Sequence, residues 1–351
     1  HMARLDKIIA VARDARASDV HITPGMPVRF RIDGQLVDMD AIPLEANECE
    51  SLAQHAVGEA FESISHEGEF DMAATFADSI RCRLNIYHSD RGICLAIRLL
   101  AAQIPTMEEL GLPRAMMDFP SYRRGIVLVT GETGSGKSTT LASIINEINH
   151  TRADHIITLE DPIEYVYESD RSLINQREVG RDTASFAQGL RAILREDPDV
   201  VLVGEMRDLD TIATALTAAE TGHLVFATLH TQSAADSVDR LIDVFPEARQ
   251  RQIRLQLSTT LKAVVSQPLL VRREGKGRCV ACEIMIVNPA IRNLIREGKT
   301  PQIENTIATT AELGSITMDH MLVKMVRERL ISRDVAISAA RDAETIKRLI
   351  R

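Results

Sequence analysis

A strand, a glycine-rich loop and a helix follow one another from residue 125 to residue 148, and this order constrains the fold more than any other stretch. Ile126 to Val129 form an apolar, β-branched run that predicts a buried parallel strand. The next residues, Gly131 to Ser138, read GETGSGKS and match the phosphate-binding loop pattern in full, with an extra glycine at 134. Apolar residues then recur at helical spacing, which predicts a helix directly after the loop.

This loop predicts binding of a nucleoside triphosphate with Mg²⁺. Glycines let backbone N–H groups converge on phosphate oxygens, and the dipole of the following helix favours negative charge there. Lys137 is expected to reach the β- and γ-phosphates, and the Ser138 hydroxyl to ligate Mg²⁺. A glycine-rich turn with a chance lysine is the alternative, which the full match between a strand and a helix disfavours. The predicted nucleotide contacts from the loop are Thr133, Gly134, Ser135, Gly136, Lys137, Ser138 and Thr139.

The composition is that of a soluble globular protein, with 45% hydrophobic and 26% charged residues. A formal net charge of −9 disfavours nucleic acid as the main partner. No apolar run reaches the ~18 residues of a membrane span and no signal peptide opens the chain, so we expect a cytoplasmic protein without direct membrane insertion.

The five cysteines predict reduced thiols. Cys279 and Cys282 have metal-like spacing but lack a second pair, which favours a structural role.

Residues 1–102 are predicted to form a small α+β domain with an antiparallel sheet. Between residues 80 and 86 apolar side chains alternate with Arg81 and Arg83, which places both arginines on the face opposite the core. Arg98 occupies the corresponding face of the partner strand. Such arginines usually form only a solvated surface. The phosphate loop in the same chain favours a catalytic role, because an external cation can accelerate phosphoryl transfer by ~10³–10⁵.

A linker is expected at residues 103–114, where prolines and turn signals interrupt the pattern. In residues 115–351 apolar strands alternate with helical patterns, which predicts a parallel sheet covered by helices and hence an α/β domain. Residues 290–351 are expected to be a helical C-terminal part. The predicted strands are 126–130, 155–159, 200–203, 224–228 and 283–287, and the predicted helices include one marked by Leu257, Leu261 and Val264.

Acidic residues follow two of the predicted strands, at the sheet edge where parallel strands place functional groups. Glu160 and Glu164 follow the strand 155–159, and both are candidates for the general base, with Glu164 favoured. Glu205 follows the strand 200–203, and Gly204 stands where many such ATPases have a metal-binding aspartate. We therefore expect Glu205 to hold Mg²⁺ through water or to polarise the nucleophile. As isolated features these carboxylates could equally be caps or ion-pair partners.

Two histidines flank the predicted strand 224–228 at a spacing of seven, so they point to opposite faces of a regular strand and a shared metal is not expected. His230, at the strand end, is predicted to contact phosphate. His223 precedes the strand and is either a further nucleotide contact or a buried, hydrogen-bonded histidine.

Together these segments resemble the type II/IV secretion ATPases, and within them the type IV pilus retraction ATPases of the PilT family. Residues 158–164 (TLEDPIE) are similar to the acidic box of the family, 203–208 (VGEMRD) to its atypical Walker B segment, and 221–230 (TGHLVFATLH) to its histidine box. Residues 17–22 (ASDVHI) resemble the start of its N-terminal domain, and 290–297 (AIRNLIRE) a stretch associated with the retraction members. The resemblance covers almost the whole chain.

The resemblance implies a PAS-like N-terminal domain joined to a RecA-like ATPase domain, assembled as a homohexameric ring that hydrolyses ATP with Mg²⁺. In such rings arginines from the N-terminal domain reach the nucleotide, and Arg81, Arg83 and Arg98 occupy the matching positions. ATP turnover then moves the two domains relative to each other and drives pilus disassembly. The expected partner is an inner-membrane pilus platform protein, with other pilus ATPases as further candidates. The expected location is the cytoplasmic base of the pilus machine at the inner membrane.

Several alternatives stay open at this point. An accessory retraction ATPase would share the same chemistry, although residues 290–297 argue against it. A pilus assembly or type II secretion ATPase commonly carries a tetracysteine insert and a longer N-terminal region, which this chain lacks. A DNA-translocating motor is opposed by the net charge, and a regulatory subunit without turnover by the intact Lys137, Ser138, Glu164 and Glu205. Glu132 replaces the proline common in the family's loop and is expected to weaken binding unless its side chain points to solvent.

Overall fold

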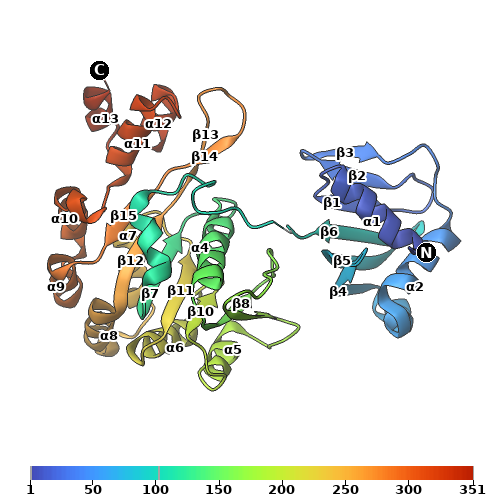
Figure 1. The fold of residues 1–351 in the computed structure, drawn as a ribbon, viewed down its shortest axis with the longest axis horizontal. Helices are drawn as coiled ribbons and strands as arrows, with labels where there is room; N and C mark the ends of the chain where they lie inside the picture. The colour runs from blue at the N-terminus through green and yellow to red at the C-terminus, as the bar shows by residue number, and fades with distance from the viewer. Residues whose placement is uncertain (1, 102, 351) are drawn as a thin grey trace. The chain divides into compact units, whose positions relative to one another are not determined.

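The computed structural model describes residues 2–101 and 103–350, apart from the side chains of residues 63, 65 and 66, and the chain divides into two compact units (Figure 1). The first unit comprises His1–Gln103 together with the short segment Glu164–Val166. The second comprises Ile104–Ile163 and Tyr167–Arg351. The segment Glu164–Val166 joins the first unit because Tyr165 pairs with Ala101 in an isolated parallel β-bridge.

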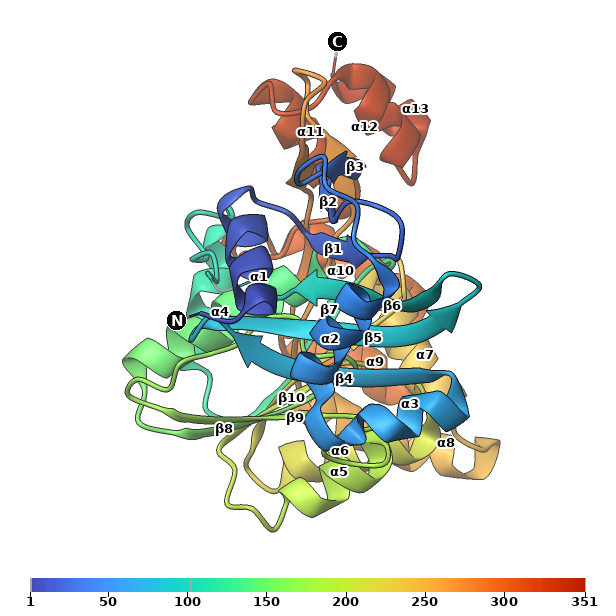
Figure 2. The ribbon, with the colours of Figure 1, turned by 90° about the vertical axis from the view of Figure 1, so that its right-hand side faces the viewer.

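The first unit is an antiparallel sheet of six strands with helices packed on one face, as Figure 2 shows. The sheet order is β3-β2-β1-β6-β5-β4. The core lies between this sheet and the apolar sides of the helices. The strands are β1 (Asp19–Ile22), β2 (Arg29–Ile32), β3 (Gln35–Asp38), β4 (Glu69–Phe76), β5 (Ile80–Ser89) and β6 (Gly92–Leu99), and the helices are α1 (Arg4–Asp14), α2 (Ala46–Val57) and α3 (Phe61–Glu67).

The arginine-bearing face predicted for this unit is confirmed in β5 and β6. Along β5 buried and half-buried residues alternate, with Cys82 and Leu84 in the core and Arg81 and Arg83 on the other side. Strict alternation of this kind follows from the two-residue period of a strand when one face of the sheet is covered. The arginines are therefore held on the open face.

The second unit is built on a seven-stranded sheet of order β15-β12-β7-β11-β10-β8-β9. Every neighbouring pair is parallel except β12 and β15, which run antiparallel. Strand β7 lies between β11 and β12 inside the sheet and is buried along its whole length. The strands are β7 (Gly125–Thr130), β8 (His155–Glu160), β9 (Leu173–Glu178), β10 (Val200–Val203), β11 (Leu224–Leu229), β12 (Leu261–Ser266) and β15 (Glu283–Ile286).

Helices cover both sides of this sheet and continue into a helical C-terminal part (Figure 1). The helices next to the strands are α4 (Lys137–Thr151), α5 (Phe186–Ile193), α6 (Leu209–Glu220), α7 (Ala234–Asp243) and α8 (Glu247–Thr260). The C-terminal helices are α9 (Pro289–Glu297), α10 (Ile303–Thr309), α11 (Met318–Arg327), α12 (Arg333–Ala339) and α13 (Ala343–Leu349). A small hairpin of β13 (Leu269–Val271) and β14 (Arg278–Val280) precedes β15.

One helix prediction was wrong, and strands β9, β12, β13 and β14 were not predicted. The helix marked by Leu257, Leu261 and Val264 ends at Thr260 as α8, and Leu261 and Val264 lie on strand β12 beside β7. The run after Thr260 is buried except at the half-buried Lys262 and contains the β-branched Val264 and Val265, so pairing with β7 outweighs the apparent helical spacing. Strand β9 was not predicted, because polar side chains on this edge strand hide the apolar pattern.

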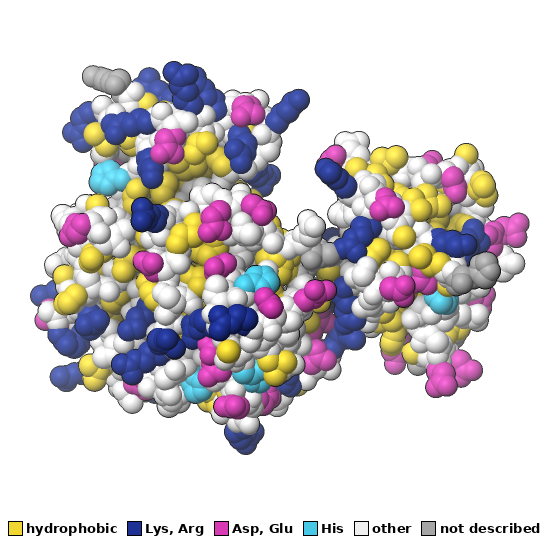
Figure 3. Space-filling model, in the orientation of Figure 1, with side chains coloured by type: hydrophobic (Ala, Val, Ile, Leu, Met, Phe, Trp, Pro, Cys, Tyr) yellow, Lys and Arg dark blue, Asp and Glu magenta, His cyan; other side chains and the backbone are white. Residues whose placement is uncertain are grey.

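The C-terminal helices carry an exposed basic surface although the whole chain is negative. Figure 3 shows Lys and Arg side chains gathered over this part of the molecule. The exposed cations of α11 to α13 and their connections include Lys324, Arg327, Arg329, Arg333, Lys347 and Arg348. None of the helices in the described part of the chain has the length and apolarity needed to cross a membrane.

Candidate functional site

The phosphate loop joins β7 to α4. Neighbouring atoms pack so tightly against one of its glycines that a side chain would not fit there. A Cβ on Gly131, which has φ +153°, would lie 2.6 Å from Ser135 Oγ and 2.9 Å from the backbone oxygen of Gln267. Gly136 forms the N-cap of α4 with φ +91°, in the left-handed region that favours glycine. The loop therefore opens directly onto a helix N-terminus, where backbone N–H groups bind anions.

Two buried polar atoms under the loop lack a partner among the described residues. They are the Oγ of Ser135, a residue that is 6% exposed, and the Oε1 of the fully buried Gln267. Gln267 Nε2 donates to the backbone oxygen of Ser135 at 3.4 Å and so supports the loop from below. A buried hydroxyl without an acceptor is costly. The unpaired Ser135 hydroxyl and the narrow cradle at Gly131 therefore fit a ligand rich in oxygen acceptors, such as a nucleotide phosphate.

The remaining loop residues lie where such a ligand could reach them. Thr133, Gly134 and Ser138 are exposed, and Thr139 is half-buried on the first turn of α4. The Ser138 hydroxyl thus lies at an open position suited to a metal ion bound with phosphate. Glu132 is exposed as well. Since its charge is in contact with solvent, it is not expected to weaken phosphate binding.

Lys137 is buried at the start of α4 with its ammonium group directed into the loop. Its Nζ donates to the backbone oxygen of Gly131 at 2.7 Å and lies 3.0 Å from Nδ1 of His230. Burial lowers the pKa of Lys137, although the negative charge of Glu205 partly opposes this shift. An ammonium held by one carbonyl and one ring nitrogen gains much from an anionic partner, so the lysine is prepared for a phosphate.

His230 connects the lysine of the loop to the carboxylate of Glu205. Its Nδ1 faces Lys137 Nζ, and its Nε2 lies 2.6 Å from Glu205 Oε1. The ammonium has no lone pair, so Nδ1 must accept and the ring proton must be on Nε2, where it donates to Glu205. The ring is thereby held in one orientation between Lys137 and Glu205. The His230 ring thus lies beside the phosphate loop, where the sequence predicted it.

Glu205 follows β10 and is held by two side chains. Its carboxylate pairs with Arg207 as well as with His230. Burial alone would raise the pKa of Glu205, but the hydrogen bonds from Arg207 and His230 and the charge of Arg207 outweigh burial and lower this pKa below its usual value. Glu205 is therefore an ionised carboxylate next to the loop, as a water-mediated Mg²⁺ ligand requires. Asp208 has a different task, because its carboxylate caps α6 by accepting from the Thr211 backbone N–H at 2.9 Å.

Glu160 ends β8 and is tied into the sheet. Its Oε2 accepts from Thr158 Oγ1 at 2.7 Å and from Gln176 Nε2 at 3.0 Å. The buried Glu178 on β9, which sequence analysis did not identify, accepts from the Ile163 backbone N–H at 3.0 Å. Glu178 thus holds the backbone between Glu160 and Glu164. These bonds leave Glu160 a positioned polar group rather than a mobile base.

Glu164 and the three arginines lie in the first unit. Glu164 is exposed within the short segment assigned to that unit. Arg83 and Arg98 are direct cross-strand neighbours on β5 and β6. Arg98 Nε pairs with Asp19 Oδ1 at 3.1 Å, and Arg81 Nη1 lies 3.5 Å from Thr75 Oγ1. Like charges directly opposite each other destabilise a sheet, so this pair gains from an added anion.

His223 lies at the other end of β11 from His230. The strand between them has six residues, which at about 3.3 Å per residue separates their backbones by roughly 20 Å. The His223 Nδ1 is 2.9 Å from the backbone oxygen of Ala218 at the end of α6. The structure therefore does not bring His223 to the phosphate loop of its own subunit. Of the two interpretations, the hydrogen-bonded histidine fits this position.

The cysteine pair gives no sign of a metal centre. Burial raises the pKa of Cys282 to about 12, which disfavours the thiolate that a metal needs. Cys279 is half-buried, and its Sγ lies 3.7 Å from the backbone oxygen of Leu270. Within residues 2–101 and 103–350, no group of three or more His, Cys, Asp or Glu side chains is placed to hold a metal by itself.

Sequence analysis missed Gln267, which supports the loop. The residue follows β12, and its backbone N–H donates to the Thr130 oxygen at 2.9 Å, where β12 pairs with β7. The signal that could have found it is the parallel strand itself. Once residues 261–266 are read as a neighbour of β7, the next residue must lie beside the loop.

Comparison with known proteins places this site in a family. The chain matches the type II/IV secretion system protein family over residues 2–345. It is 45% identical over 341 residues to the type IV pilus retraction ATPase PilT of Pseudomonas aeruginosa, covering 97% of this chain and 99% of that protein. The chain belongs to the secretion ATPase family, among its PilT-type members.

Two further matches agree with this placement. The PilT-type chain is 45% identical over 318 residues to a twitching motility protein of Neisseria gonorrhoeae, covering 90% of this chain and 85% of that protein. A crystal structure of the pilus retraction motor PilT with bound ADP matches with a TM-score of 0.89 and 44% identity, covering 99% of this chain and all of that chain. The α/β fold with N- and C-terminal domains and the membership in a nucleotide-binding ATPase family are thereby confirmed.

Proposed function

We propose that this PilT-type chain is an ATP-hydrolysing motor that powers retraction of type IV pili. The single observation that carries the proposal is the chain of contacts from Lys137 through His230 to Glu205 at the phosphate loop. This arrangement links the group that would bind the γ-phosphate to an ionised carboxylate suited to Mg²⁺. The names of the retraction and twitching relatives support the biological role.

In the proposed reaction Lys137 and the loop N–H groups would hold the phosphates, while Ser138 and Glu205 would hold Mg²⁺. Bound there, the ion would neutralise the negative charge that develops on the phosphate oxygens. Glu164 is proposed as the general base that orients the attacking water, and Glu160 is fixed by its hydrogen bond from Thr158 Oγ1. His230 fixes the positions of Glu205 and Lys137 relative to each other, because each of its ring nitrogens contacts one of them.

The arginines of the first unit are proposed to complete the site in a homohexameric ring. The adjacent Arg83 and Arg98, together with Arg81, form a cationic surface that favours an anionic partner. Cations supplied to a phosphate loop stabilise the charge of the transition state. We place the N-terminal domain at residues 1–102 and the ATPase domain at 115–351, with the linker between them as the hinge of the power stroke.

The partner is proposed to be an inner-membrane pilus platform protein, with the ring peripheral at the cytoplasmic base of the pilus machine. Other pilus ATPases are further candidate partners. The accessory paralogue and the assembly or type II secretion ATPases are less supported, since the retraction and twitching relatives are 45% identical to this chain, whereas the type IV pilus ATPase PilU and the type II secretion system protein HxcR are 33% identical.

The test combines turnover with a cellular readout. Purified protein should hydrolyse ATP in a Mg²⁺-dependent way. Lys137→Ala should abolish turnover, and the exposed Lys324→Ala on α11 should leave it within twofold as a matched control. In the source cell, loss of the gene should leave assembled pili that do not retract, and only the wild type and Lys324→Ala should restore retraction. Turnover unaffected by Lys137→Ala, or normal retraction without the gene, would refute the proposal.

A further inference from the structure

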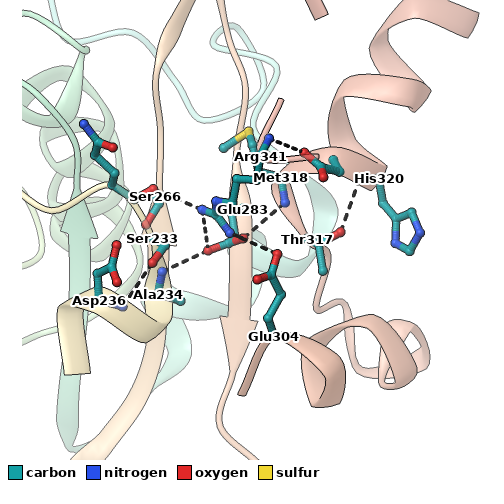
Figure 4. Close-up of polar contacts among 12 residues, drawn as sticks. Ser233, Ala234, Asp236, Ser266, Glu283, Glu304, Thr317, Met318, His320 and Arg341 are labelled. Atoms are coloured by element: carbon teal, nitrogen blue, oxygen red, sulfur yellow. Dashed lines mark hydrogen bonds and ion pairs between the residues drawn. The ribbon is translucent and has the colours of Figure 1, made fainter. Parts of the chain in front are cut away.

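Glu283, at the start of β15, is a buried carboxylate on which several elements converge (Figure 4). The residue is 1% exposed. Its Oε1 accepts from the Ala234 backbone N–H at 2.9 Å, and its Oε2 from the Met318 backbone N–H at 3.1 Å. Those two residues are the first residues of α7 and α11. One carboxylate thus binds the N-termini of two helices. The dipoles of both helices favour its negative charge at this position.

Arg341 completes this cluster from the connection between α12 and α13. Its guanidinium pairs with both carboxylate oxygens of Glu283, at 3.0 Å from Nη2 to Oε1 and through Nη1 to Oε2. Nη2 also donates to the backbone oxygen of Gln232 at 3.0 Å, and Nη1 lies 3.5 Å from Glu304 Oε1. The planar fork of an arginine can make these bonds at once, which a lysine cannot.

The segment around Arg341 is itself fixed. Asp319, near the start of α11, accepts from the Arg341 backbone N–H at 2.9 Å and from the Asp342 backbone N–H at 3.1 Å. Burial opposes the positive charge of Arg341, but the hydrogen bonds and charge of Glu283 outweigh burial and raise its pKa. The guanidinium therefore stays charged and rigidly placed at the junction between the C-terminal helices and the sheet.

This junction lies next to the nucleotide site along the chain. Gln232, which accepts a bond from Arg341, is two residues after His230, and Ala234, which donates to Glu283, is four residues after it. Ser233 between them caps α7 by accepting from the Asp236 backbone N–H at 3.0 Å. The short segment from His230 to α7 is consequently held at its far end by Arg341 and Glu283. Its near end is the histidine that contacts Lys137 and Glu205.

We propose that Arg341 is a positioning residue for His230, and that the Arg341–Glu283 pair couples the C-terminal helices to the nucleotide site. The inference rests on the proposed ATPase function. If α11 to α13 shift, the bidentate pair must move or break, and the segment that carries His230 moves with it. By linkage, a nucleotide that changes the position of His230 must also bias the C-terminal helices. A load on these helices would thus reach the site of hydrolysis.

The test compares Arg341→Lys with a matched control, Arg348→Lys, an exposed arginine on α13. Arg341→Lys keeps the charge but loses the fork that joins Glu283 to Gln232. We expect its kcat to fall roughly ten- to hundredfold with KM for ATP within threefold, because displacing a catalytic contact by a fraction of an ångström acts on the transition state. Arg348→Lys should match the wild type.

A double-mutant cycle with His230→Ala separates positioning from simple destabilisation. If Arg341 acts through His230, Arg341→Lys should cause no further loss of kcat when His230 is already Ala. Additive losses, or wild-type kcat and KM with only a lower melting temperature, would overturn the inference. All assays are run at a temperature at which each variant is folded by circular dichroism. Should Arg341→Lys not fold, Asp319→Asn is the milder second variant, with the same pattern expected at reduced size.

Hydrogen exchange keeps this test distinct from that of the proposed function. Amides of residues 230–237 should exchange faster in Arg341→Lys than in Arg348→Lys, whether or not ATP is hydrolysed. A wild type without turnover would refute the proposed function, while this exchange difference would still show that Arg341 fixes the segment. Equal exchange in the two variants would refute the positioning role even in an active enzyme.

Discussion

Replacing Gly204 by alanine tests why this chain lacks the aspartate that many ATPases carry there. A Cβ on Gly204 would lie 2.9 Å from the backbone oxygen of Leu159 and 3.3 Å from Cα of Glu160. The Gly204 backbone N–H already donates to the same Leu159 oxygen at 2.7 Å. The ends of β8 and β10 are thus packed backbone to backbone, and neither side can move a side chain away. Glycine at this position is a packing requirement of the sheet.

The size of the effect follows from the contact. The 2.9 Å distance is about 0.5 Å short of the 3.4 Å at which ordinary contact begins, so the strand ends must separate by several tenths of an ångström. Overpacking of this kind costs about 1–3 kcal/mol. At roughly 2–4 °C per kcal/mol for a domain of this size, the melting temperature should fall by about 2–12 °C. The displaced strand end carries Glu205, so kcat should also fall about tenfold or more.

Thermal unfolding and ATP turnover of Gly204→Ala, compared with Gly189→Ala, check this reasoning. A Cβ on Gly189 also approaches Leu159, but it meets the side-chain atom Cδ2 at 2.6 Å and the Thr183 side chain at 3.1 Å. These atoms can rotate away, and alanine is favoured over glycine inside a helix by about 1 kcal/mol. Gly189→Ala should therefore change kcat less than twofold. Wild-type stability and turnover in Gly204→Ala would refute the packing argument.

Three further predictions follow from single contacts. Asp208→Ala should lower the melting temperature by a few degrees with kcat within twofold, because it removes a helix cap worth about 1 kcal/mol; a large loss of kcat would show a catalytic role instead. Gln267→Ala should weaken ADP binding roughly tenfold by calorimetry, because the oxygen of Ser135 loses its support; unchanged affinity would contradict this. The folded pKa of Glu205 lies below its usual 4.5, so its stabilising contribution is complete above that pH and is lost as the pH falls through the lower value. Glu205→Gln should therefore flatten the acid limb of the melting temperature against pH, and parallel limbs in variant and wild type would contradict the shift.

Much of this site could be predicted from the sequence because its parts have local signatures. The phosphate loop is contiguous, and its flanks fix a strand before and a helix after it. Parallel strands bring their carboxyl ends together, so Glu205 and His230 had to lie at the same edge as Lys137. The alternation around Arg83 fixed the open face of β5 in the same way. In each case the period of the backbone determines where the side chain points.

The remainder depends on contacts between distant segments. Leu261 and Val264 have helical spacing, and only pairing with β7 makes them a strand. Arg341 and Glu283 are 58 residues apart and belong to no local pattern, so nothing in the sequence joins them. His223 shows that a local motif can also mislead. It belongs to the histidine box, yet it lies at the edge of the sheet away from the phosphate loop. Which of the two histidines meets the loop follows only from the direction of β11.

The proposal that the arginines complete the site across subunits is tested most directly by turnover at increasing protein concentration, with molar mass from light scattering. We predict that specific ATPase activity rises as the mass approaches six subunits. We also predict that Arg83→Ala abolishes turnover while the ring stays assembled, and that Arg91→Ala, from the exposed turn of the same hairpin, behaves as wild type. Activity independent of concentration in a monomer, unaffected by Arg83→Ala, would contradict it.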